Sequence, residues 1–182
     1  MDDTSETLAT LAQHGNEQAA ADLVERFYQK IYAYLRRQTL NNEDAFDLTQ
    51  KVFSEAWRSL PRFERQSQFS TWIYKIAHHT YVDWVRQHSR RHLRESRWWE
   101  LNHRSVDTPF QEFEDRELAN RIYEIVSSME ESHRRPLHLH YYEHLTLDQT
   151  AEILEVSVST VKNRLREAIG LIKEQTETIS SL

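Results

Sequence analysis

Residues 43–59 read EDAFDLTQKVFSEAWRS, and apolar side chains recur in this stretch at helical spacing. Asn41 and Asn42 precede it as candidate caps, and the acids Glu43 and Asp44 favour a helix N-terminus. The pattern predicts a helix that buries one stripe, formed by Ala45, Leu48, Val52 and Ala56. The opposite face carries Asp47, Gln50, Lys51 and Ser54, flanked by Phe46 and Trp57. Such a face is either a solvated flank or a protein-docking surface.

A second helix is predicted after a short loop. Pro61 marks the end of the first helix, residues 62–68 form a polar loop that contains Phe63, and Ser70 is a candidate cap. One side of the second helix is expected to carry Ile73, Ile76, Ala77, Thr80 and Trp84. The other side is expected to carry Lys75, His78, His79, Val82 and Arg86.

The residue types of this second helix suit single-stranded nucleic acid, because cations track phosphates and rings stack on unpaired bases. Trp72 and Tyr74 lie on its two flanks. The alternative is that these two aromatic residues belong to the core of a small helical bundle.

These segments resemble region two of a bacterial RNA polymerase sigma factor, and the short chain is most similar to the extracytoplasmic-function group. The matching runs are DAFDLTQKVF (44–53), AW (56–57), FSTWIYKIA (69–77) and DWVR (83–86). His79 departs from the Asn that is common in the group.

The resemblance implies two sets of site residues. The first helix would dock on the clamp coiled coil of the largest polymerase subunit through Asp44, Asp47, Leu48, Gln50, Lys51, Phe53 and Trp57. The loop and the second helix would open the promoter at its minus-ten element through Phe63, Trp72, Tyr74, Lys75, His78, His79, Arg86, Arg90 and Arg91.

The composition of the 182 residues predicts an all-α protein, because it includes only two Gly and three Pro and little strand-like alternation. Cysteine is absent, which excludes disulfides and thiolate chemistry. The N-terminus is polar and lacks a signal-peptide pattern. No apolar run approaches the roughly 18 residues of a membrane helix. We therefore expect a cytoplasmic protein without membrane insertion.

Charge is unevenly distributed along the chain, whose formal net charge is −6. Residues 61–106 contain 9 basic and 4 acidic groups, whereas residues 107–132 contain 2 basic and 8 acidic groups. A basic block within an acidic chain indicates a local polyanion site. The acidic remainder is expected to suppress tight binding to random DNA.

The chain is expected to form two small helical domains, 1–95 and 117–182, joined by an acidic linker at 96–116. A weak helix should stop at His14-Gly15-Asn16, before a strong helix over 18–39. The stretch 105–117, which overlaps this linker, contains Pro109 and the acids Asp107, Glu112, Glu114, Asp115 and Glu117, so it is expected to be extended or disordered. It is either a solvated tether or, as the resemblance implies, an RNA mimic near the exit channel.

Residues 88–104 are rich in Arg and contain Trp98 and Trp99. We interpret Arg90 and Arg91 as phosphate contacts. The two tryptophans are expected to cover the core. The alternative is that they make aromatic contacts at a phosphate-binding edge.

The C-terminal part begins with a helix over 116–129, whose predicted inward side chains are Leu118, Ile122, Ile125, Val126 and Met129. Thr146 and Gln149 then form a capping box for a short helix. After a turn at Glu155, Ser157 caps a further helix, with the small Ala151 where the two helices cross. This arrangement predicts a helix-turn-helix. The outward residues Ser159, Lys162, Asn163 and Arg166 can reach bases or phosphates, although a solvated face would also be polar.

This part resembles region four of the same group, through LTLDQTAEIL (145–154) and VSVSTVKNRL (156–165). The resemblance implies that the minus-thirty-five element is read by Ser157, Ser159, Thr160, Lys162, Asn163, Arg164 and Arg166. Glu155 and Ser159 replace glycines common in the group, so Glu155 is expected in a left-handed conformation. Glu167 stands where the group often has Arg, which puts one backbone contact in doubt.

Two histidine pairs, His88/His92 and His140/His144, have a spacing that could hold zinc on a helix, but neither has an evident third ligand. No Gly-rich phosphate loop or catalytic triad pattern occurs. We expect no metal, no cofactor and no enzymatic activity.

The predicted function is that of an alternative sigma factor. It would bind core RNA polymerase and promoter DNA, duplex upstream and single-stranded at the minus-ten element, and would direct promoter-specific transcription initiation. The group implies an anti-sigma partner. Two alternatives are a polymerase-independent helix-turn-helix regulator and a sigma-mimic adaptor without DNA binding.

Overall fold

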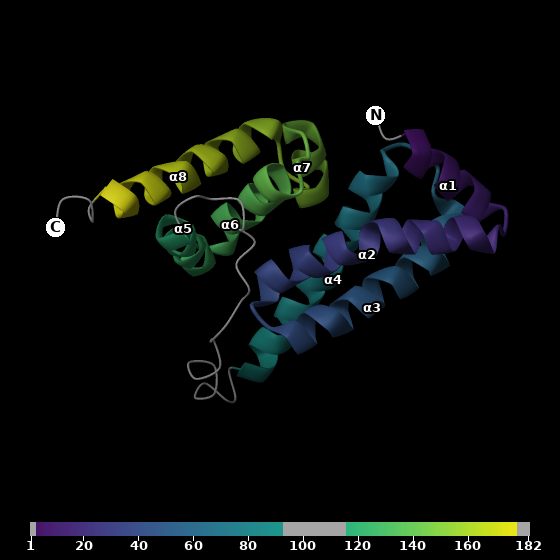
Figure 1. Ribbon diagram of the computed structural model, residues 1–182, viewed down its shortest axis with the longest axis horizontal. Helices are drawn as coiled ribbons and strands as arrows, with labels where there is room; N and C mark the ends of the chain where they lie inside the picture. Colours follow the sequence, from purple (N-terminus) through teal and green to yellow (C-terminus); the bar gives the residue numbers. More distant parts are fainter. Residues whose placement is uncertain (1–2, 93–115, 178–182) are drawn as a thin grey trace. The chain divides into compact units, whose positions relative to one another are not determined.

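The computed structural model describes residues 3–92 and 116–177, and every regular element in these two ranges is helical (Figure 1). The chain divides into two compact units. The first contains α1 to α4, drawn from purple to teal, and the second contains α5 to α8 apart from the end of α7. The all-α prediction is therefore confirmed. The predicted linker lies outside the described residues except for Arg116.

The first unit begins with α1 (Asp3–Gln13) and α2 (Glu17–Thr39). Gly15 between them has a φ of 86°, a left-handed conformation that glycine tolerates. The Asn16 side chain accepts a hydrogen bond of 2.9 Å from the Ala19 N–H and so caps α2. The predicted stop at residues 14–16 is confirmed.

The predicted helix after Asn41 is α3 (Asn42–Ser59). The Asn41 side chain accepts hydrogen bonds from the backbone N–H groups of Glu43, at 2.8 Å, and Asp44, at 3.2 Å. The predicted apolar stripe is confirmed, because all four of its side chains are buried: Ala45, Leu48, Val52 and Ala56. A short 3₁₀ turn, η1 (Leu60–Arg62), follows and leads into the loop before the next helix.

The last helix of the first unit, α4 (Phe69–His92), packs on both α2 and α3. It starts one residue before Ser70, so the prediction that Ser70 is the cap is wrong. The Trp72 N–H instead donates to the Gln68 carbonyl at 3.0 Å.

The buried face of α4 also differs from the prediction. Tyr74 and His78 are 2% and 7% exposed, whereas Ile76 and Trp84 are only half-buried. The prediction that His78 lies on the outer side is wrong. The cause is α2, because the Tyr34 ring meets that of Tyr74 edge-on at 5.6 Å and the Gln38 carbonyl accepts from the Tyr81 hydroxyl at 3.3 Å.

The second unit comprises α5 (Arg116–Ser128), α6 (Glu131–Leu137), the π-helical turn η3 (His138–Tyr142), α7 (Leu147–Leu154) and α8 (Val158–Glu177). Its core consists of Ile125, Val126, Met129, Leu137, Ala151, Val161, Leu165 and Ala168. The prediction that Leu118 points inward is wrong, since it is 43% exposed. It precedes the turns of α5 that contribute to this core.

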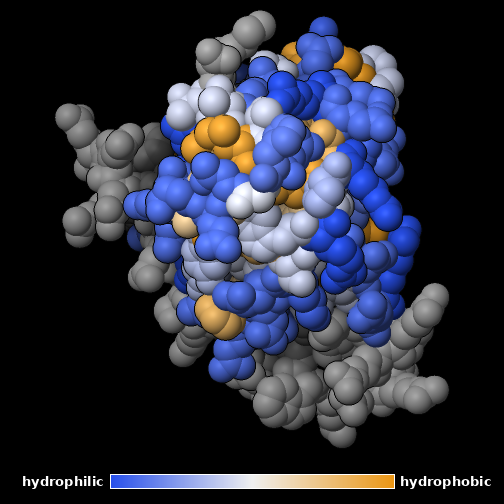
Figure 2. Space-filling model, turned by 90° about the vertical axis from the view of Figure 1, so that its right-hand side faces the viewer, coloured by the Kyte–Doolittle hydropathy of each residue, from blue (hydrophilic) through white to orange (hydrophobic). Residues whose placement is uncertain are grey.

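The surface is largely polar. On the face shown in Figure 2, hydrophilic residues predominate and hydrophobic residues form small separate groups. Across the described residues, the exposed large hydrophobic side chains come from five different elements: Leu11, Phe46, Leu118, Tyr141 and Leu171. Scattered exposure of this kind is ordinary, so any docking surface must rely on polar groups as well.

Candidate functional site

The outer face of α3 is open to solvent. Asp47, Gln50 and Lys51 are exposed, and Phe46 beside them is 51% exposed. Among the other residues predicted to dock, Asp44 and Trp57 are half-buried, and Leu48 and Phe53 are buried. The structure thus separates the predicted set into side chains that can touch a partner and side chains that hold the helix.

Two members of this set, the buried Phe53 and the exposed Gln50, attach α3 to α2. The Phe53 ring stacks on Tyr28 with ring centroids 5.7 Å apart. The Gln50 amide donates to the Tyr28 hydroxyl at 3.4 Å. Both contacts are made with Tyr28 of α2, so the polar face of α3 is supported by a second helix.

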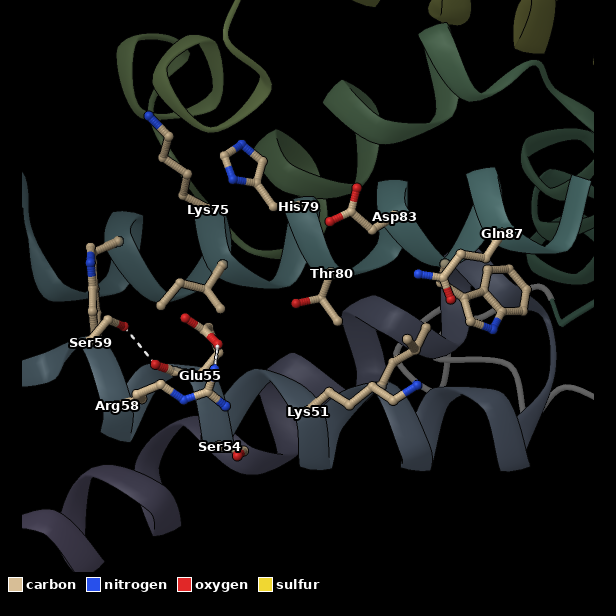
Figure 3. Close-up of a pocket in the computed structure, with 14 residues that line it drawn as sticks. Lys51, Ser54, Glu55, Arg58, Ser59, Lys75, His79, Thr80, Asp83 and Gln87 are labelled. Atoms are coloured by element: carbon tan, nitrogen blue, oxygen red, sulfur yellow. Dashed lines mark hydrogen bonds and ion pairs between the residues drawn. The ribbon is translucent and has the colours of Figure 1, made fainter. Parts of the chain in front are cut away.

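A groove of about 790 Å³ runs between α3 and α4 (Figure 3). Lys75, His79 and Asp83 lie in a row along one edge of α4, while Lys51 and Ser54 come from α3. Trp72 and Trp84 also line it. Cations beside partly exposed indole rings can bind both the phosphates and the bases of a single strand.

The acidic side chains of this groove have local partners. Arg58 pairs with Glu55 at 2.9 Å, and the Ser59 hydroxyl donates to the Glu55 carbonyl at 2.6 Å. Arg86 and Asp83 form a longer contact of 3.5 Å between two exposed side chains. Surface pairs of this kind contribute little stability, so they leave the basic groups available for exchange with phosphates.

The residues predicted to handle the opened strand do not form one surface. His79 and Arg86 are exposed, and Trp72 and Lys75 are half-buried. The remaining described members, Phe63, Tyr74 and His78, are buried, and the Arg90 and Arg91 side chains lie outside the described ones. The Phe63 ring lies 4.9 Å from that of Trp72 and 5.9 Å from that of Phe69, so it supports the loop from within.

The side chains of α1 that contact this loop were not predicted from the sequence. The Gln13 amide donates to the carbonyls of Leu60 and Phe63. The Glu6 carboxylate accepts from the Phe69 N–H. No local pattern could reveal these contacts, because their partners lie 47 to 63 residues apart in the chain.

The predicted caps of α7 and α8 are confirmed. Thr146 and Gln149 exchange hydrogen bonds of 2.8 and 3.2 Å, each from a backbone N–H to the other's side chain. The Ser157 hydroxyl accepts from the Thr160 N–H at 3.1 Å. Between the helices Glu155 has a φ of 55°, which confirms the expected left-handed conformation. The Val156 N–H then donates back to the Ala151 carbonyl at 3.1 Å, which closes α7.

The outer face of α8 carries the predicted DNA-reading residues. Ser157, Ser159, Lys162, Asn163 and Arg166 are exposed, and Thr160 and Arg164 are half-buried. The Arg166 guanidinium donates to the Asn163 side-chain oxygen at 3.0 Å. The guanidinium and the amide keep further N–H donors, so both side chains can still contact a base or a phosphate.

Glu167 has a partner that the sequence did not reveal. Its carboxylate lies 2.9 Å from the His133 Nε2, which links α8 to α6. The Glu167 side chain remains 63% exposed beside the outer face of α8. It thus adds a negative charge next to the residues proposed to meet DNA.

The His140/His144 pair does not form a metal site. His144 lies beyond η3 with a φ of 53°, so it does not share a regular helix face with His140. The His140 Nδ1 lies 2.7 Å from the Leu145 carbonyl. Residues 3–92 and 116–177 contain no cluster of three or more potential His, Asp or Glu ligands. The side chains of His88 and His92 lie outside the described ones. In the same ranges, no helix has the length and apolar character needed to cross a membrane.

Two family models match the chain. Sigma-70 region 2 matches residues 23–91, and sigma-70 region 4 matches residues 119–170. The chain is 32% identical to RNA polymerase sigma factor YlaC of Bacillus subtilis over 159 residues, which cover 86% of this chain and 92% of YlaC. It is 29% identical to the ECF RNA polymerase sigma-E factor of Haemophilus influenzae, with 97% of both chains covered.

Two solved structures share the fold. One is CnrH in complex with the cytosolic domain of CnrY, with a TM-score of 0.71 and 20% identity over 96% of this chain and 98% of that chain. The other is the sigma factor RpoE with the anti-sigma factor NepR from Bartonella quintana, with a TM-score of 0.72 and 15% identity over 86% of this chain and 96% of that chain.

Proposed function

Because the chain belongs to the extracytoplasmic-function (ECF) group of sigma factors, which bind core RNA polymerase and direct initiation at specific promoters, we propose how its residues divide this work. The first unit, within residues 1–95, holds the polymerase through α3 and handles the opened minus-ten strand through α4. The second unit, within 117–182, reads the minus-thirty-five element through α8.

The observation that carries the docking assignment is the exposure of Asp47, Gln50 and Lys51 above a fully buried apolar stripe. These side chains contribute nothing to the core of the unit, and the half-exposed Phe46 beside them adds apolar area. Interfaces combine such an apolar contact with polar groups that fix orientation. Asp44 and Trp57 would complete the contact from its edges.

The strand assignment rests on the groove between α3 and α4. Lys75 and His79 line it and supply an ammonium and an imidazole, and Trp72 supplies a ring for stacking. Arg86 does not line the groove but is exposed further along α4. Phe63, Tyr74 and His78 are buried, so their role is indirect: they hold the loop and the helix in place.

The upstream assignment rests on the exposed face of α8. Lys162 and Arg166 can contact guanine edges or phosphates, and Asn163 can read adenine. Specificity requires both DNA regions, because each small unit offers few base contacts.

Run-off transcription with bacterial core polymerase and fragmented genomic DNA tests the docking assignment. Asp47→Lys should abolish the discrete transcripts that the unmodified protein produces. Glu17→Lys is the matched control, since Glu17 is exposed at the start of α2, eleven residues before the Tyr28 that contacts α3, and it should leave transcription unchanged. Core binding that survives Asp47→Lys would overturn the assignment.

The same assay separates the two alternatives. A stand-alone regulator would bind duplex DNA unaided and would not depend on Asp47. A sigma-mimic adaptor would bind core polymerase without giving transcripts, and Lys162→Ala with Arg166→Ala would leave its function unchanged.

We extend the proposal to an inhibitory protein partner, because the two solved structures of the same fold hold CnrY and the anti-sigma factor NepR, respectively. Such a partner would compete with core polymerase for the first unit. In this proposal the protein acts in the cytoplasm, where RNA polymerase works. It catalyses no covalent reaction and needs no cofactor. Release of the partner by core polymerase in a competition assay would support it, and simultaneous binding of both would contradict it.

A further inference from the structure

We propose that α1 is a positioning element for promoter opening, and that Gln13 and Glu6 are its positioning residues. Residues 60–68, here called the α3–α4 loop, connect the docking helix to the strand-handling helix. The inference rests on the proposed role of α4 in opening the promoter. It concerns a segment outside the region 2 family match, which begins at residue 23.

Gln13 ties together the two ends of η1. Its side-chain amide donates one hydrogen bond to the Leu60 carbonyl, at 2.9 Å, and another to the Phe63 carbonyl, at 2.7 Å. An amide carries two N–H donors, so both are used on the loop backbone. This single side chain therefore fixes the turn that precedes Phe63, whose ring lies against Trp72.

Glu6 acts at the start of α4. Its Oε1 accepts from the Phe69 N–H at 2.6 Å. The first N–H groups of a helix have no acceptor within the helix, and a negative charge there is stabilising. The wrongly predicted cap at Ser70 is thus replaced by a carboxylate from another helix. Glu6 therefore fixes the position at which α4 begins. Lys75 and His79 lie further along the same helix.

Arg65 provides a third contact between the loop and α1. It has a φ of 56°, in the left-handed region that residues with side chains rarely adopt. Its guanidinium donates to the Thr10 hydroxyl. That hydroxyl donates in turn to the Glu6 carbonyl at 2.8 Å, so its oxygen is oriented to accept from Arg65.

The three contacting residues share one face of α1. Glu6, Thr10 and Gln13 follow each other at spacings of four and three, which places them along one side of a helix. Their partners are Leu60, Phe63 and Arg65 in the loop and Phe69 at the start of α4, so the contacts span the whole loop. A loop fixed in this way is ordered before DNA arrives, which lowers the entropic cost of capturing a strand.

The test compares variants of the full-length protein that differ in the donors at position 13. Gln13→Glu preserves shape but removes both donors and faces two carbonyls, whereas Gln13→Lys restores N–H donors. Gln29→Glu is the matched control, because Gln29 is exposed on α2. Strand opening is measured by 2-aminopurine fluorescence in the minus-ten element of a promoter found by run-off transcription. Affinity for core polymerase and the thermal unfolding midpoint are measured on the same samples.

We expect Gln13→Glu to lower the open-complex fraction by about tenfold, as the loss of two hydrogen bonds allows. Core affinity should stay unchanged, the unfolding midpoint should fall only slightly because the same two hydrogen bonds also stabilise the folded chain, and Gln13→Lys should recover most of the opening. Unchanged opening in Gln13→Glu would overturn the inference. A parallel loss of opening, core affinity and unfolding midpoint would also overturn it, because α1 would then be only structural.

Lys75→Ala with His79→Ala separates this inference from the proposed function. If this double variant loses opening while Gln13→Glu does not, the inference fails and the role of α4 stands. If Gln13→Glu loses opening while the double variant does not, α1 positions the loop, and strand handling must be reassigned from α4.

Discussion

Glu155 holds the turn between α7 and α8 in a left-handed conformation, with a φ of 55°. For a residue with a side chain this conformation costs roughly 1–2 kcal/mol, and glycine escapes most of the cost. Glycine also raises the entropy of the unfolded chain, and this effect lowers the free energy of unfolding by about 0.4–1 kcal/mol. We predict that Glu155→Gly raises the free energy of unfolding by up to about 1 kcal/mol, as measured by urea denaturation of the full chain.

The matched control is Glu152→Gly, three residues earlier on an exposed position of α7. Glycine inside a helix lowers stability by about 1 kcal/mol, so the two substitutions should have opposite effects. A lower urea midpoint for Glu155→Gly would show that the Glu155 side chain contributes more than its strain costs.

Glu167 provides a second prediction for a single residue. Its carboxylate lies beside the outer face of α8 and 2.9 Å from His133. Glu167→Gln keeps a hydrogen-bonding group toward His133 but removes the charge that repels phosphates. We predict tighter binding of the polymerase holoenzyme to promoter DNA and a steeper salt dependence of that binding. Equal affinity at every salt concentration would show that Glu167 lies too far from the DNA backbone to affect it.

At the level of elements, α3 was predictable and α4 was not. The four stripe residues of α3 are buried as predicted. The helix α4 also buries Tyr74 and Tyr81, which contact Tyr34 and Gln38 of α2. Sequence periodicity alone does not show which flank of a helix a neighbouring helix covers, and the wrong side of His78 follows from this.

Two adjacent residues of α4 should separate packing from function. Tyr74 is 2% exposed and packs on Tyr34, whereas Lys75 is half-buried in the groove beside α3. We predict that Tyr74→Ala costs about 3–5 kcal/mol of folding free energy, as large aromatic truncations in cores do. Lys75→Ala should cost far less and should lower the open-complex fraction. Urea denaturation and 2-aminopurine fluorescence measure the two effects, and a loss of stability in Lys75→Ala equal to that in Tyr74→Ala would contradict the division.

The candidate sites were also only partly predictable. The caps at Asn41, Thr146 and Ser157 depend on residues within three positions, and all three are confirmed. The contacts of Gln13 with the α3–α4 loop and of Glu167 with His133 join residues 34 or more positions apart. Such contacts depend on how the helices pack, which no local pattern encodes.

For the whole molecule, the uneven charge predicts that core polymerase is needed for DNA binding. The chain has a net charge of −6, yet residues 61–106 hold 9 basic and 4 acidic groups. Random duplex DNA meets the field of the entire protein, and affinity without base contacts depends on phosphate neutralisation. The free protein should therefore bind a random duplex no more tightly than about 10⁻⁵ M at physiological salt.

Fluorescence anisotropy with a short random duplex measures this affinity, with and without core polymerase. Substituting the acids Asp107, Glu112, Glu114, Asp115 and Glu117 by their amides removes five negative charges. This variant should bind the random duplex more tightly, whereas amide substitution of Glu25 alone should have little effect. Tight and salt-resistant binding by the unmodified protein would show that its basic block acts independently of the acidic remainder. Binding of that kind would favour a regulator that works without polymerase.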